Sequence, residues 1–71
     1  TKAYIALVKS ISENHIVVLD THKNLTLSLN ITDKTSLRGG YSSLSDVAVG
    51  TDVGVRADYD NITALVIRKI S

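Results

Sequence analysis

The sequence predicts a single small all-β domain, and three observations lead to this prediction. Short apolar runs alternate with turn-forming residues along the chain. No stretch carries a sustained helical period of apolar residues. Residues 25–32 alternate strictly, with leucine or isoleucine at every odd position and Thr, Ser or Asn at every even one. A chain of 71 residues is enough for one domain.

The first two strands are expected over residues 3–11 and 15–19, which are rich in Ile, Leu, Val and Ala. Polar residues 12–14 separate them and indicate a turn. A second turn is expected over residues 20–24, where Asp, Thr, His, Lys and Asn follow one another. The two strands are therefore expected to form a hairpin.

The third strand is expected over residues 25–32. Its period of two places the leucines and the isoleucine on one face and the hydroxyl and amide side chains on the other. Such a strand is half buried against a core.

The pattern changes between residues 33 and 50. Gly39 and Gly40 allow positive φ angles at little cost. Ser43, with Asp46 three places on, resembles a helix-capping arrangement and predicts one helical turn over residues 44–47. Leu44, Val47 and Val49 are expected to plug one end of the fold.

The last two strands are expected over residues 53–58 and 62–70, joined by a turn at residues 58–61. Gly54 lies inside the first of them, which indicates a β-bulge or a close approach of another backbone.

Three strands, a connection with a helical turn, and two further strands form the element order of an oligonucleotide/oligosaccharide-binding (OB) fold. We therefore expect a five-stranded, closed or partly open OB-like barrel spanning residues 1–71. Closure would remove the exposed edges that an open sheet leaves. An SH3-like barrel is the alternative, because it also uses about five short strands.

Composition excludes several classes of site. There is no Cys, hence no disulfide and no thiolate metal site. A net charge of +1 argues against a partner recruited mainly by overall charge. No run approaches the length of a membrane-spanning helix, so no membrane insertion is expected. Because the chain opens with Thr1, we expect a processed product or a domain excised from a larger protein.

Three segments carry a resemblance to a known family. They are the first hairpin, ALVKSISENHIVV at residues 6–18, then SLSDVAVGTDVGV at residues 43–55, and ITA at residues 62–64. Together they resemble a widespread, uncharacterised bacterial family of small barrel domains, although Ala6 and Glu13 stand where that family often has glycine. The resemblance implies a barrel fold and a periplasmic or otherwise extracytoplasmic location. It implies no functional residue.

The sequence predicts no enzyme, cofactor or metal site. Nucleophilic catalysis needs a nucleophile, a base and an orienting group that converge in a cleft. The two histidines, His15 and His22, flank or lie within one hairpin region, with Asp20 nearby. Imidazole and carboxylate can bind a metal ion, but ordinary turn chemistry explains these residues better, since a third clear ligand is missing.

Ligand-binding candidates follow from the OB-like order, because such domains combine basic grooves with exposed aromatic side chains. The candidates are Tyr41, Tyr59, Arg38 and Arg56, and the wider set of tyrosines and basic residues that could contact such a ligand also includes Tyr4, Lys9, Arg68 and Lys69. They could bind single-stranded nucleic acid or an oligosaccharide, although three tyrosines as the only aromatic residues make nucleic acid the less favoured partner.

Several strands are apolar on both faces, for example Ile5 and Leu7 beside Ala6 and Val8. A solvated sheet alternates, so the excess predicts an apolar strand surface that meets a protein partner or a second copy. The leading interpretation is a non-enzymatic interaction or structural module, with the OB-type binding domain as the alternative.

Overall fold

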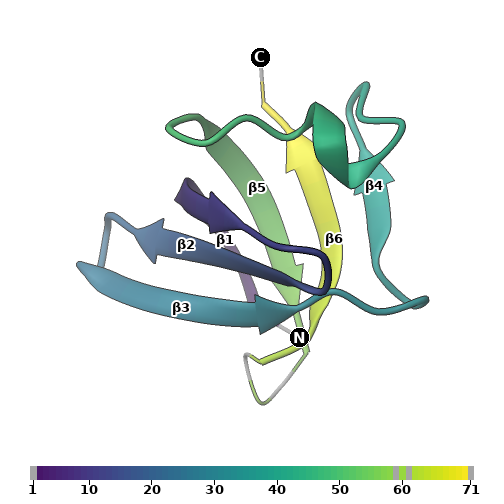
Figure 1. Cartoon of the computed structure of the whole chain (residues 1–71). Coiled ribbons are helices and arrows are strands. Elements are labelled where there is room, and N and C mark those ends of the chain that lie inside the picture. The colour runs from purple at the N-terminus through teal and green to yellow at the C-terminus, as the bar shows by residue number, and fades with distance from the viewer. Residues whose placement is uncertain (1, 59, 61, 71) are drawn as a thin grey trace.

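The computed structural model describes residues 2–58, 60 and 62–70 and shows an all-β fold with one short 3₁₀-helix, as predicted (Figure 1). The elements are β1 (Lys2–Ile11), β2 (His15–Asp20), β3 (Leu25–Asn30), β4 (Ser36–Arg38), the 3₁₀-helix η1 (Leu44–Asp46), β5 (Asp52–Ala57) and β6 (Ala64–Lys69). No helix in this described part is long and apolar enough to cross a membrane.

The prediction of a five-stranded barrel is wrong, because the strands form one mixed, open, six-stranded sheet. Its order is β3-β2-β1-β5-β6-β4, and the β4–β6 pair is parallel while the other pairs are antiparallel. The additional strand, β4, has three residues, too few for hydrophobic periodicity to reveal. One isolated parallel bridge, Asn30 to Thr63, joins the edge strand β3 to the residue directly before β6.

Strand β1 is shared by the two halves of the sheet. It pairs with β5 from Lys2 to Leu7 and with β2 from Leu7 to Ile11. A shift of register between Val8 and Ser10 marks a β-bulge, which bends the strand. Strand β1 therefore changes neighbour along its length, and Leu7 belongs to both pairings.

The core lies between the two halves of the sheet and is built from aliphatic side chains. The largest fully buried ones are Ile16, Leu29, Ile67, Val8, Val18 and Val53. Each contributes about 1.5–3 kcal/mol on burial. The predicted alternation of the third strand is confirmed, with Leu29 fully buried, Leu27 half buried and Leu25, at the strand end, 47% exposed.

The predicted helical turn is confirmed as η1. Oδ2 of Asp46 accepts hydrogen bonds from the backbone N–H groups of Ser42 (2.8 Å) and Ser43 (3.1 Å). These bonds favour the carboxylate, which lowers the pKa of Asp46 below its usual value. Val47 is buried and Leu44 packs against the core, but Val49 is 60% exposed, so its expected role as a plug is wrong.

Gly39 and Gly40 adopt positive φ angles of 74° and 109°, as the sequence predicted. At Gly39 the surroundings also exclude a side chain, because a Cβ atom would lie 2.6 Å from the backbone oxygen of Lys69. Glycine therefore lets the chain turn tightly against β6 directly after β4.

Candidate ligand-binding face

On the outer face of β1, β5, β6 and β4, the strand register places the side chains in two adjacent rows that run across the strands. The first row runs Ile5, Gly54, Arg68 and Arg38. The second row runs Ala3, Arg56, Val66 and Ser36. Because side chains alternate along a strand, the residues between these rows, such as Val55 and Ile67, point into the core. We call these two rows the arginine face.

Gly54 forms the floor of an open recess of about 580 Å³ in the arginine face. It lies between Ile5 and Arg68, where any other residue would project a side chain outward. The predicted bulge or close backbone approach at Gly54 is wrong. The register shift of β5 follows Arg56, and a Cβ atom at Gly54 would meet Arg68 at an ordinary 3.6 Å.

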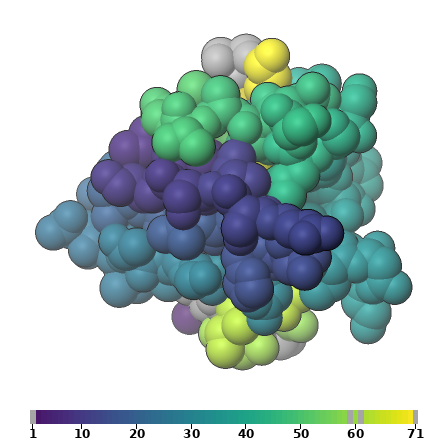
Figure 2. Space-filling model, in the orientation of Figure 1, coloured from purple at the N-terminus to yellow at the C-terminus, as the bar shows by residue number. Residues whose placement is uncertain are grey.

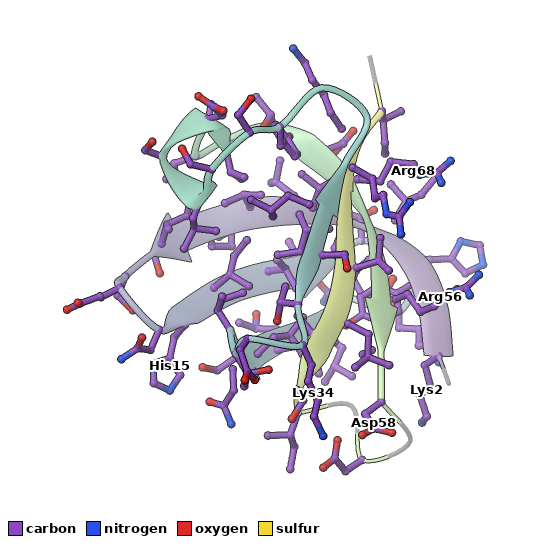
Figure 3. All side chains as sticks on the ribbon, turned by 90° about the vertical axis from the view of Figure 1, so that its right-hand side faces the viewer. Lys2, His15, Lys34, Arg56, Asp58 and Arg68 are labelled. Carbon is purple, nitrogen blue, oxygen red and sulfur yellow. The ribbon has the colours of Figure 1, made fainter. Side chains whose placement is uncertain are left out.

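Three guanidinium groups line this recess, those of Arg38, Arg56 and Arg68. Arg38 and Arg68 are direct partners in the parallel pair, and Arg56 lies diagonally from Arg68. Like charges at such positions destabilise a sheet. Within the part of the chain that the structure describes, none of the three has a carboxylate or hydrogen-bond partner. In Figure 3, Arg56 and Arg68 point to the same side of the sheet.

A second hollow, of about 780 Å³, lies on the other side of the first half of β1. It shares Ala3, Tyr4 and Ile5 with the recess of the arginine face, so the two hollows meet at β1. Basic side chains at its rim are those of Lys2, His22 and Lys23.

Asp20 and Tyr4 also line the second hollow. Asp20 is buried, and its Oδ1 accepts the backbone N–H groups of His22 (3.1 Å) and Lys23 (3.3 Å). Burial, together with the negative charge of Asp20, raises the pKa of Tyr4 to about 12. The phenol therefore stays protonated and polar at neutral pH.

The structure brings together two of the four candidates identified in the sequence, Arg38 and Arg56. Tyr41 is half buried and packs against the core, outside the recess. Tyr59 lies outside the described residues. Arg68 was one of several basic candidates in the sequence, and Gly54 was not identified as a site residue. Only strand register shows that Arg68 is the neighbour of Arg38 and that Gly54 is the neighbour of Ile5.

Among residues 2–58, 60 and 62–70, no group of three or more His, Asp or Glu side chains could hold a metal ion. His15 begins β2 and Asp20 ends it, so an extended strand of about 16 Å separates them. Their proximity in sequence therefore does not make a site.

The expected apolar strand surface is less exposed than the sequence suggested. Ile5 is 59% exposed, but Leu7, Val17 and Leu19 are half buried. The other strongly exposed aliphatic side chains, Leu25, Val49, Ile62 and Ile70, lie on separate segments. Figure 2 shows the face over β2 and β3 as closely filled, with the turn between these strands projecting at its left edge.

No protein-family model, curated protein or solved structure matches this chain. The interpretation of the site therefore rests on the residues of the chain itself.

Proposed function

We propose that this domain is a non-enzymatic binding module that holds an extended acidic segment of a protein partner on the arginine face. One observation carries the proposal. Three guanidinium groups occupy a paired block of the sheet and have no carboxylate partner among the described residues. An acidic ligand would relieve their mutual repulsion.

Arginine suits this role because its planar group presents donors in a fork that fits a carboxylate with two hydrogen bonds. Small residues in the two rows, Gly54 and Ala3, leave room for a chain to approach these groups. The attraction is local rather than global, since the whole chain carries a net charge of only +1.

The alternative function is binding of single-stranded nucleic acid or an acidic oligosaccharide, and the same three arginines favour it. Single-strand binders stack bases on exposed aromatic side chains. Among the described residues, neither row of the arginine face contains an aromatic residue. OB domains bind mainly through the face of their strands 2 and 3, whereas the arginine face lies on β1, β5, β6 and β4. A peptide is therefore the better match.

We also propose that the fold is OB-like and that the domain belongs to a larger bacterial envelope protein. The strand connectivity and the parallel bridge from Asn30 to Thr63, which joins β3 to the residue directly before β6, support an OB-like arrangement. The resemblance of residues 6–18 and 43–55 to envelope barrel domains supports the location. A module of this kind works through contacts with neighbouring chains. Half-buried Leu7, Val17 and Leu19, beside exposed Ile5, offer a second surface for such contacts.

The test is a titration of a fluorescent oligoglutamate peptide at low salt. Arg68→Gln is expected to weaken binding about tenfold, the effect of losing one charge-assisted hydrogen bond of about 1.4 kcal/mol. Lys34→Gln is the matched control, because it removes one positive charge outside the recess (Figure 3). An equal loss in both variants would contradict the proposal. Tighter, steeply salt-dependent binding of a single-stranded oligonucleotide would favour the alternative.

A further inference from the structure

We propose that the first half of β1 is an open sheet edge to which an extended acidic peptide adds as a further strand, in the hollow beyond the end of β2. This deepens the proposed function and rests on it for the acidic character of the peptide. The backbone pairing rests on separate observations.

The two-sided pairing of β1 leaves a gap in the sheet. Residues 2–6 of β1 are paired with β5 only, because pairing with β2 begins at Leu7, opposite Leu19. One residue later β2 ends at Asp20, and the chain turns into β3. A strand that continued the path of β2 would lie beside residues 2–6.

The backbone of this segment points its hydrogen-bonding groups into the gap. Val8 bonds on the side of β5, since its N–H donates to the oxygen of Thr51 (2.9 Å) and its oxygen accepts from Gly50 (2.8 Å). Bonding direction alternates along an antiparallel strand. The N–H and C=O groups of Ala3 and Ile5 therefore point away from β5, towards the missing strand.

The hollow lies along the unpaired side of residues 2–5 of β1. It is open, measures about 780 Å³ and is bordered by β1 and the turn that follows β2. Residues 2–6 extend over about 17 Å, enough to pair with roughly five residues of a peptide. Proteins commonly protect edges with proline or a bulge. This segment has neither, because the bulge of β1 lies between Val8 and Ser10.

Charge and polarity indicate the side chains of such a peptide. One of its faces would continue the rows of the arginine face, where the small side chain of Ala3 leaves the path to Arg56 open. Lys2 and Lys23 stand at the rim. The other face would meet half-buried Tyr4 and exposed Leu25. The peptide that best matches both faces of this edge is a strand that alternates acidic and aliphatic residues.

The probe is an eight-residue peptide of alternating glutamate and valine. Its binding is measured by ¹⁵N NMR of the labelled domain. We expect the amides of Ala3 and Ile5 to shift and to gain protection from hydrogen exchange. Methylation of alternate backbone nitrogens of the peptide, in either register, is expected to weaken binding at least tenfold, because it removes donors to β1.

Ala3→Pro is the matching change in the domain. It deletes an N–H that faces the gap, and proline is tolerated where an edge N–H faces outward. Ser28→Pro is the control on the other edge. The backbone N–H of Asn30 donates to the oxygen of Ile62 and therefore faces away from β2. Because bonding direction alternates along a strand, the N–H of Ser28, two residues earlier, also faces away from β2. Binding should fall at least tenfold in Ala3→Pro and stay unchanged in Ser28→Pro.

Three results would overturn strand addition. The first is equal binding of the methylated and unmethylated peptides, a comparison made on the wild-type chain and independent of how Ala3→Pro folds. The second is protection of Ala3 and Ile5 that depends on protein concentration without peptide, because a second copy would then cover the edge. The third is no binding at millimolar peptide. If oligoglutamate still depends on Arg68 when the first result is obtained, the proposed function stands and strand addition fails. If no acidic peptide binds, both fail.

Discussion

At the scale of residues, the recess exists because two positions of the arginine face carry little or no side chain. Gly54 contributes no side chain to the middle of the arginine face, and Ala3 contributes a single methyl group beside Arg56. The arginines Arg38 and Arg68 are direct neighbours across two strands, an arrangement that costs stability without a counter-ion. The acidic ligand that we propose would neutralise this pair.

Tyr4 makes the stability of the fold sensitive to alkaline pH. Its pKa in the folded chain is raised to about 12, above the ordinary value of 10.0, so the stabilisation is complete below pH 10 and is lost as pH rises towards 12. The loss is on the order of 1 kcal/mol after allowance for solvent screening at the half-buried hydroxyl.

Urea unfolding followed by circular dichroism at about pH 9 and about pH 11 measures this effect. Tyr4→Phe should show a smaller fall in unfolding free energy between the two conditions than the wild-type chain. An identical fall in both proteins would mean that Tyr4 does not titrate differently in the folded and unfolded states.

At the scale of elements, sequence patterns predicted the strands whose apolar residues alternate or cluster, as in β3 and β5. They also predicted η1, because Ser43 and Asp46 satisfy local hydrogen bonds. They missed β4, whose stability comes from parallel pairing with β6, a distant segment. Local patterns do not report such pairings. For the same reason they could name Arg38, Arg56 and Arg68 among the basic candidates but could not show that Arg68 lies between Arg38 and Gly54.

The turn after β4 depends on Gly39, and we expect Gly39→Ala to destabilise the fold by about 3 kcal/mol. The new Cβ atom would lie 2.6 Å from the oxygen of Lys69 at a φ of 74°. Gly50→Ala is the control, with a φ of 89° and no atom within 4 Å of the position that its new methyl group would take. It should cost only about 1 kcal/mol, the strain of a positive φ. Thermal or urea unfolding of both variants compares the two costs, and equal costs would contradict the steric explanation.

At the scale of the whole molecule, the bent strand β1 contributes residues to the core, to the arginine face and to the second hollow. β1 pairs with β5 on one half and with β2 on the other, and this change of neighbour opens the second hollow beside the arginine face. The sequence predicted the all-β class, but not that the sheet would stay open with six strands. That outcome depends on long-range pairing such as β4 with β6.

The most direct test of the arginine face is an NMR titration of the ¹⁵N-labelled domain with oligoglutamate. We predict that the largest amide shifts fall on Ala3, Ile5, Gly54, Arg56 and Arg68, which form one block across β1, β5 and β6. Shifts confined to the outer face of β2 and β3, or no shifts at millimolar peptide and low salt, would contradict the assignment of this face as the binding surface.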